Sequence, residues 1–169
     1  MRDLSRRRFV LGTGAVAATG ALAGCSGNGN GNGGNGNGNG NGNGNGGGDG
    51  PVGRAETHLS ENEANNYDGM EDLTGESEVT VDVGAGDTGL AFGPAGIIVD
   101  AGTTVVWEWT GEGGGHNVSS VDGSDFEFES ERTDEAGFTF EQTFEESGAA
   151  LYVCVPHQAQ GMYGAVAIE

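Results

Sequence analysis

The sequence predicts an all-β fold, a sandwich of about eight short antiparallel strands within residues 67–169. Two observations predict it. Runs of β-branched and aromatic residues recur about every 8–12 residues, separated by glycine and aspartate. No stretch of the folded region carries apolar residues at strong helical spacing, and only residues 60–67 suggest a short helical turn. We expect strands at residues 79–83, 97–99, 103–109, 116–121, 126–128, 138–144, 150–154 and 164–168, with 90–92 as a further candidate.

Residues 1–24 are typical of an export signal. Three arginines at 6–8 precede an apolar run of about 15 residues, which is shorter than the roughly 20 that a membrane span needs. SRRRFV at residues 5–10 resembles the twin-arginine signal, which exports folded proteins. LAGC at residues 22–25 resembles a lipobox, in which Cys25 becomes the lipid-bearing first residue of the mature chain. An ordinary secretory signal that leaves a free amino terminus is the alternative.

Residues 26–50 consist almost entirely of glycine and asparagine. Such a stretch buries no apolar area to offset the entropy of ordering, so we interpret it as a flexible tether with a reach of about 25–30 Å. An aggregation-prone tract is the alternative. The expected organisation is therefore a signal at 1–24, a lipid-anchored linker and lead-in at 25–66, and one folded domain at 67–169.

The charge balance restricts the partners. The chain has 26 acidic residues against 6 arginines and no lysine, a net charge of −20, and cleavage before Cys25 leaves −23. Nucleic acid is excluded as a partner because binding it requires basic groups. At 1 M salt the Debye length falls to about 3 Å, which makes such self-repulsion tolerable and suggests a salt-loving organism. An ordinary soluble acidic protein, or a surface that steers a basic partner, is the alternative.

The stretch YVCVPHQAQGM at residues 152–162 concentrates rare side chains. It holds Cys154, His157 and Met162, in a chain with two cysteines, three histidines and three methionines. A thiolate, an imidazole and a thioether from one loop are ligands that suit copper, and Pro156 stiffens the loop. Such a site needs a second imidazole from elsewhere.

Two histidines could supply that imidazole. His58 lies in the polar lead-in, whereas His116 begins an expected strand after a glycine-rich turn. A set of His116, Cys154, His157 and Met162 would be the trigonal His₂Cys arrangement with a weak axial methionine that marks electron-transfer copper. Taken singly, the cysteine and the methionine are also ordinary core residues, and a histidine at a strand end is often a polar rim residue.

Three stretches resemble a known family. They are TVVWEWTGEGGGHNV at residues 104–118, YVCVPHQ at 152–158 and GMYG at 161–164. They resemble the halocyanins, small blue copper proteins of haloarchaea within the plastocyanin-like branch of the cupredoxin family. The resemblance covers about residues 67–169, and the C-x₂-H-x₄-M spacing is specific to that branch. It implies a Greek-key β-sandwich that holds one copper atom cycling between Cu(I) and Cu(II).

The resemblance also implies roles for neighbouring residues. Asn117 follows the first ligand, as in plastocyanins, and would hold the cysteine loop by hydrogen bonds. Val155 departs from the small polar residue that is common after the ligand cysteine, which leaves a backbone group as the remaining partner for Asn117. His157 would lie nearest the surface, within an apolar docking patch formed by Pro156, Ala159, Met162 and Ala165.

We therefore expect a membrane-tethered blue copper protein and not an enzyme. It would be exported by the twin-arginine route and anchored through Cys25 to the outer face of the cell membrane. There, as a monomer, it would pass single electrons between membrane-associated donor and acceptor proteins. A copper enzyme is disfavoured because only His58 remains for a second metal centre. Two rival functions are a copper carrier or storage lipoprotein and a metal-free adhesion module.

Overall fold

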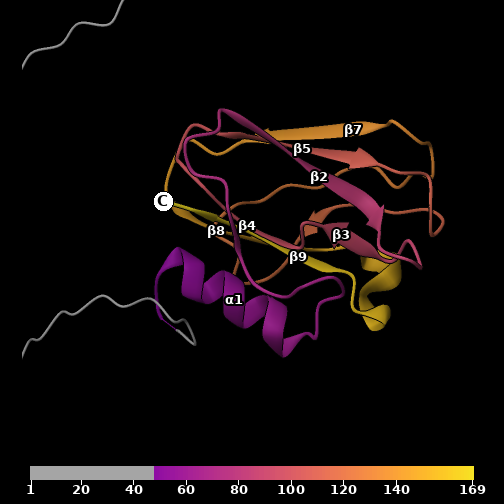
Figure 1. Ribbon diagram of the computed structural model, residues 1–169, viewed down its shortest axis with the longest axis horizontal. Coiled ribbons are helices and arrows are strands. Elements are labelled where there is room, and N and C mark those ends of the chain that lie inside the picture. Colours follow the sequence, from indigo (N-terminus) through magenta and orange to yellow (C-terminus); the bar gives the residue numbers. More distant parts are fainter. Residues whose placement is uncertain (1–47) are drawn as a thin grey trace, which may run out of the picture. The chain divides into compact units, whose positions relative to one another are not determined.

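The computed structural model describes residues 48–169, and these form a sandwich of two β-sheets with one helix, α1 (Pro51–Glu61), on its outside (Figure 1). The predicted export signal and most of the predicted linker lie outside the described residues. The described part also contains the short 3-10 helix η1 (Val155–Gln160). Its nine strands are β1 (Glu71–Asp72), β2 (Glu78–Ala85), β3 (Ala91–Gly93), β4 (Gly96–Val99), β5 (Thr104–Trp109), β6 (Ser119–Ser120), β7 (Thr139–Thr143), β8 (Gly148–Val153) and β9 (Tyr163–Ile168).

The two sheets are mixed. One has the strand order β1-β4-β9-β8-β6 and the other has β3-β2-β5-β7. The predicted sandwich is confirmed, but the expectation that its strands are all antiparallel is wrong, because β2 pairs parallel with β5 and β4 pairs parallel with β9. Between β2 and β5 the chain contributes β4 to the opposite sheet, so strands distant in sequence become neighbours. Spacing along the sequence predicts how many strands form but not which of them pair.

Two expected strands are reduced in the structure. The stretch 116–121 contributes only the two residues of β6. The stretch 126–128 contains no assigned strand, and next to it lies an isolated bridge between Ser119 and Glu129. Both stretches belong to the long connection between β5 and β7, which closes one edge of the sandwich by a few backbone hydrogen bonds, including Ser120 N–H to the Phe128 carbonyl at 2.9 Å.

The main core lies between the two sheets. Residues alternate in the first part of β2, where Val79, Val81 and Val83 are buried and the residues between them are exposed. Trp107 and Trp109 both face this core, as their shared parity in β5 predicts. Trp107 lies at the centre of an aromatic cluster, with ring centroids 5.4–6.5 Å away in the side chains Phe128, Phe140, Phe144 and Tyr152. A core of large rigid rings fixes the ends of the strands that carry the site.

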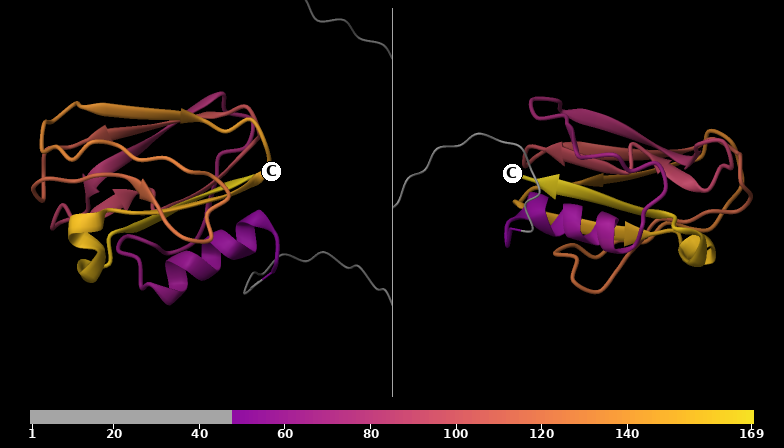
Figure 2. Two further views of the ribbon diagram at one scale, coloured as in Figure 1. Left: turned by 180° about the vertical axis from the view of Figure 1, so that it is seen from behind. Right: turned by 60° about the horizontal axis from the view of Figure 1, so that its bottom comes forward.

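Helix α1 packs on the outer face of the sheet that contains β8 and β9 (Figures 1 and 2). Pro51 occupies its first turn, where no N–H is needed. Ala55 and Leu59, one turn apart, are fully buried against that face. As a result every residue of β8 and β9 is buried, on one face by the opposite sheet and on the other by α1.

This helix corrects the expected start of the domain. The sequence placed residues 25–66 in a linker and lead-in and the ordered domain from Tyr67 onward, whereas residues 51–61 are helical and belong to the packed domain. The reason is that the outward side chains Ala149, Leu151 and Val153 of β8 are apolar and need a cover.

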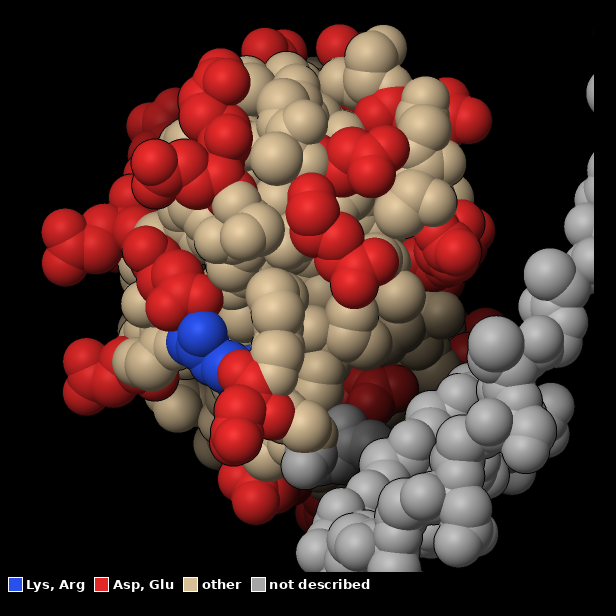
Figure 3. Space-filling model, turned by 90° about the vertical axis from the view of Figure 1, so that its left-hand side faces the viewer, with Lys and Arg blue, Asp and Glu red and all other residues tan. Residues whose placement is uncertain are grey.

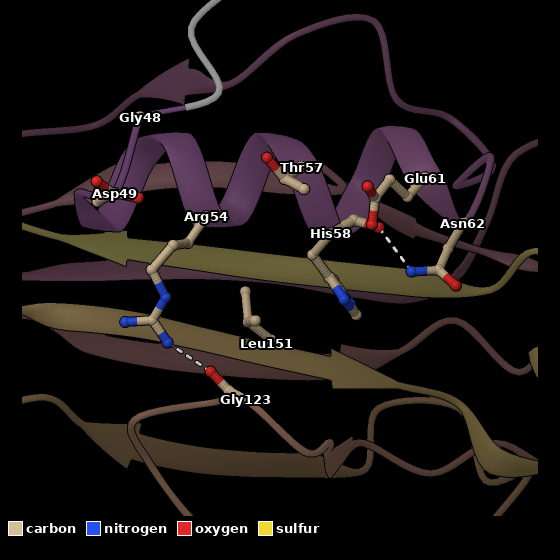
Figure 4. A pocket seen from close by; sticks show the side chains of 9 residues that line it. All are labelled: Gly48, Asp49, Arg54, Thr57, His58, Glu61, Asn62, Gly123 and Leu151. Atoms are coloured by element: carbon tan, nitrogen blue, oxygen red, sulfur yellow. Dashed lines mark hydrogen bonds between the residues drawn. The ribbon is translucent and has the colours of Figure 1, made fainter.

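A charged contact joins α1 to the turn that follows β6. Arg54 donates to the carboxylate of Asp125 at 2.6 Å. It also donates to the carbonyl of Gly123 (Figure 4). The same Asp125 oxygen accepts the N–H of Ala149 in β8 at 2.8 Å. The Arg54 guanidinium holds the pKa of Asp125 below its usual range.

The surface is strongly acidic. Figure 3 shows acidic side chains spread over one side of the domain, with a small basic spot among them. Among residues 48–169 there is no helix with the length and apolar character needed to cross a membrane.

Candidate metal centre

The predicted ligands meet at one end of the sandwich. Cys154 directly follows β8, His157 lies in η1, and Met162 immediately precedes β9. His116 follows the loop after β5. Figures 1 and 2 show η1 at the end of the domain opposite the C-terminus.

Three donor atoms form a nearly equal-sided triangle. The sulfur of Cys154 lies 3.5 Å from Nδ1 of His116 and 3.4 Å from Nδ1 of His157, and the two Nδ1 atoms are 3.0 Å apart. His116 and Cys154 are completely buried, and His157 is partly exposed. Two imidazole nitrogens and one cysteine sulfur at the corners of a small buried triangle fit a trigonal copper site.

The proton on His116 is placed by a backbone carbonyl. Its Nε2 lies 2.8 Å from the carbonyl oxygen of Glu112. Because a carbonyl only accepts, Nε2 must donate, and in the neutral ring Nδ1 then carries a lone pair directed at the triangle. The Trp109 indole N–H donates to the His116 carbonyl at 3.2 Å and further fixes this residue. Sequence reasoning did not identify Glu112, because its contribution is a backbone atom.

A glycine in β2 allows the Glu112 carbonyl to reach His116. Gly84 lies where the register of β2 shifts and has φ +95°. A Cβ on it would lie 2.6 Å from Thr110 Oγ1 and 2.7 Å from the Glu112 oxygen, so any larger residue would push this loop away. Thr110 Oγ1 lies 2.9 Å from the Gly84 carbonyl, to which it donates, and accepts the N–H of Glu112 at 3.2 Å. Gly84 is therefore the one residue in the sequence that could have indicated this close approach of the loop to β2.

The cysteine loop is fixed by backbone hydrogen bonds. Asn117 Oδ1 accepts the N–H of Val155 at 2.9 Å, which is the backbone partner that the departure at Val155 left open. The N–H of Cys154 donates to the Met162 carbonyl at 3.0 Å, and the N–H of His157 donates to the Cys154 carbonyl at 3.0 Å. These bonds hold the thiol and the imidazole in place whichever side chain follows the cysteine.

Burial shifts the protonation of all three donors. It lowers the pKa of His116 and of His157, so both imidazoles are neutral at pH 7, and the positive charge of Arg132 lowers both further. Burial raises the pKa of the Cys154 thiol, although backbone N–H groups of Asn117 and His157 act in the opposite direction. Metal binding must therefore displace the thiol proton, and affinity for the metal should rise with pH.

The other two candidates differ in position. Met162 is fully buried in the same interior cluster as Cys154, and its N–H donates to the His157 carbonyl at 3.3 Å. His58 is not part of the site. It projects from α1 (Figure 4). Its Nε2 lies 3.3 Å from the Tyr152 carbonyl, and its ring packs edge-on against the Tyr163 ring.

The expected docking patch is smaller than the sequence suggested. Met162 and Ala165 are fully buried and contribute nothing to the surface. Ala159 is exposed and Pro156 is partly exposed, and Val155 is 53% exposed beside them. The apolar surface next to His157 therefore consists of Val155, Pro156 and Ala159.

Comparison with known proteins identifies a family model, two sequence relatives and one similar solved structure. The sequence model for copper binding proteins of the plastocyanin/azurin family matches residues 79–169. The chain is 64% identical over 170 residues to halocyanin from Natronomonas pharaonis, with 100% of both chains covered. It is 33% identical over 100 residues to plastocyanin from Capsella bursa-pastoris, covering 54% of this chain and 100% of that one. Among solved structures, a purple cupredoxin from Nitrosopumilus maritimus matches 54% of this chain and 99% of its own, with a TM-score of 0.45 and 25% identity.

Proposed function

This chain belongs to the plastocyanin/azurin family of copper-binding proteins, and from that premise we propose that it is a blue copper protein that passes single electrons between partners. The observation that carries the proposal is the buried triangle of His116, Cys154 and His157. Bound copper would supply the reversible change between Cu(I) and Cu(II).

The task of the chain is to keep the donors still during that change. Cu(I) and Cu(II) prefer different geometries, and a site that relaxed toward either would slow the transfer. The carbonyl of Glu112 and the side chain of Asn117 restrain His116 and the cysteine loop, and the surrounding core excludes water from Cys154. This arrangement is rigid because the donors are restrained by backbone groups of two packed sheets.

Met162 is proposed as a weak fourth ligand. It precedes β9, is fully buried beside Cys154, and its backbone carbonyl accepts the cysteine N–H. A thioether is a soft donor that suits copper in this position. Met162→Leu keeps the apolar volume and removes the sulfur, so we expect copper to stay bound with a changed reduction potential. An unchanged potential in this variant would count against ligation by Met162.

His157 is proposed as the point of electron exit and entry. It is the one donor of the three that is partly exposed, and the apolar residues Val155, Pro156 and Ala159 lie with it in η1. A small apolar surface suits brief encounters with partners. We expect His157→Ala to slow electron exchange with a redox partner, measured by stopped-flow mixing with a small reductant and with a protein acceptor. Exchange at the original rate would contradict this role.

A tethered location is proposed from the N-terminal sequence. A lipid on Cys25 and the Gly/Asn tract would hold the domain at the outer face of the membrane after twin-arginine export, within reach of membrane-associated donors and acceptors. The start of α1 supports it, because this helix begins near the C-terminus, at the end opposite η1 (Figures 1 and 2). The metal site would then face away from the attachment point.

Two variants test this location. Cys25→Ser should move the protein from the membrane fraction to the soluble fraction, because the lipid is lost. Replacing Arg6 and Arg7 together by lysine should stop export. A Cys25→Ser protein that stays in the membrane fraction would contradict lipid anchoring, and export of the double variant would contradict the twin-arginine route.

The deciding experiment for electron transfer is a redox titration of the purified chain loaded with one copper. An electron carrier should give a reversible one-electron couple and an intense colour in the oxidised form. A copper carrier would instead give a colourless Cu(I) protein that releases its metal to a chelator or partner. An adhesion module would bind no copper. The residues described here offer one cluster of metal-binding side chains, so a second centre has no support within 48–169.

A further inference from the structure

Arg132 is an unusual residue in this domain because of its charge. The residues that the structure describes contain every acidic side chain of the chain except Asp3, together with two arginines and no lysine. Arg54 is paired with Asp125, and this is the only ion pair within residues 48–169. Arg132 is thus a cation without a carboxylate partner in a chain with net charge −20.

Two independent contacts hold Arg132 next to the metal centre. Its Nε donates to the carbonyl of Gly115, the residue before His116, at 3.2 Å. The following residue, Thr133, forms an antiparallel bridge with His116 through backbone hydrogen bonds of 2.9 and 3.0 Å. The close approach depends on a glycine, since a Cβ on Gly115 would lie 3.1 Å from Nε. The guanidinium is therefore held against the segment that carries a ligand.

We propose that Arg132 raises the reduction potential of the copper centre by placing a permanent positive charge beside His116. The inference rests on the proposed function. The oxidised centre carries one more positive charge than the reduced centre, so a nearby cation disfavours the oxidised form. A guanidinium keeps its charge at all pH values of interest, so the effect is constant.

The placement of this charge rests on the contacts of Arg132 and of its neighbour Thr133. The Nε contact with the Gly115 carbonyl and the Thr133–His116 bridge together hold the guanidinium beside the segment that carries His116. The sequence neighbours Glu131 and Asp134 are exposed acids whose charge has the opposite sign. Removing Arg132 would therefore leave a surface that favours Cu(II).

The test compares reduction potentials of copper-loaded full-length variants in 0.1 M and 3 M KCl. At 0.1 M, Arg132→Gln should shift the Cu(I)/Cu(II) equilibrium toward Cu(II) by about three- to tenfold, a tenfold change being about 59 mV for one electron. Arg132→Glu should give about twice that shift on a logarithmic scale, and Arg132→Lys should retain most of the original potential. In 3 M KCl the shifts should fall below about twofold, because the Debye length is under about 3 Å.

Arg54→Gln is the matched control. It removes the same charge from α1, where Arg54 is paired with Asp125 and does not contact the segment that carries His116. We therefore expect it to change the Cu(I)/Cu(II) equilibrium by less than about twofold. An unchanged potential in Arg132→Gln at 0.1 M KCl would overturn the inference. So would a shift that persists in 3 M KCl, or an equal shift in Arg132→Lys, because either outcome indicates altered geometry and not charge.

Failure of this inference differs from failure of the proposed function. If the original chain shows no reversible couple, electron transfer itself is wrong. If it shows the couple and the Arg132 variants share its potential, only the role of Arg132 is wrong. Because Arg132 is exposed, the variants should fold, and circular dichroism of each one checks this.

Discussion

Replacing Leu59 by alanine should destabilise the domain by about 3 kcal/mol. Leu59 is fully buried between α1 and the sheet. Its Cδ1 packs directly on the backbone of β4, since a Cβ on Gly96 would lie 2.7 Å from it. The substitution therefore removes apolar contacts from the interface that attaches α1 to the domain.

The magnitude follows from how little this interface can collapse. Removing the buried part of a leucine costs roughly 2–5 kcal/mol, with the larger values where a cavity remains. A sheet held by parallel pairing of β4 with β9 cannot move inward to fill the space, so the middle of that range applies. For a domain of this size, a loss of about 3 kcal/mol lowers the melting temperature by roughly 10–15 °C.

Urea denaturation of the copper-free protein, followed by tryptophan fluorescence, measures the change. Ser60→Ala is the control, because the neighbouring serine is exposed and its loss should alter the free energy of unfolding by less than about 0.5 kcal/mol. The copper spectrum of Leu59→Ala should stay as in the original protein, since Leu59 lies on the outer face of the sheet. A loss below about 1 kcal/mol would show that α1 is not docked as described.

Three further predictions concern the loop that contains Glu112, the pH dependence of stability and the salt dependence of the melting temperature. Gly84→Ala should lower the free energy of unfolding by more than the roughly 1 kcal/mol expected for strain at positive φ, because it also displaces the Glu112 carbonyl from His116. Gly102→Ala is the control for strain alone, since Gly102 has φ +96° and nothing lies within 4 Å of an added Cβ. Equal losses of unfolding free energy for the two variants in urea denaturation would contradict the role of Gly84. Burial lowers the pKa of His58 below its ordinary 6.5, so its contribution to stability is present above pH 6.5 and is lost as the pH falls. In the copper-free protein, His58→Gln should therefore make the dependence of the unfolding free energy on pH less steep between about pH 7 and pH 5. An unchanged slope would refute this. With a net charge of −20, the melting temperature should rise between about 0.1 M and 1 M KCl, and a constant or falling value would show that self-repulsion does not limit stability.

The parts of the fold that the sequence predicted depend on local patterns. Alternation in residues 79–83 and the shared parity of Trp107 and Trp109 directly predict which side chains face the core. The clustering of His116, Cys154 and His157 was predictable for a different reason. Cysteine and histidine are so rare in this chain that few combinations could form a metal site.

The rest depends on contacts that no local pattern encodes. Helix α1 has only Ala55 and Leu59 as fully buried apolar anchors, so its apolar face is short, and it is stabilised by the sheet beneath it. The parallel pairing of β2 with β5 depends on where the chain changes sheets. The contribution of Glu112 comes from a backbone carbonyl, which is the same atom in every residue type.

The visible absorption spectrum of the purified chain during titration with Cu(II) tests the central claim most directly. If His116, Cys154 and His157 close around one copper ion, a strong thiolate-to-copper band should appear toward the red and saturate at one copper per chain. Cys154→Ser should abolish the band, and Cys25→Ser, which removes the second cysteine of the chain, should leave it unchanged. Only weak absorption in the original chain, or a strong band that survives Cys154→Ser, would contradict the account.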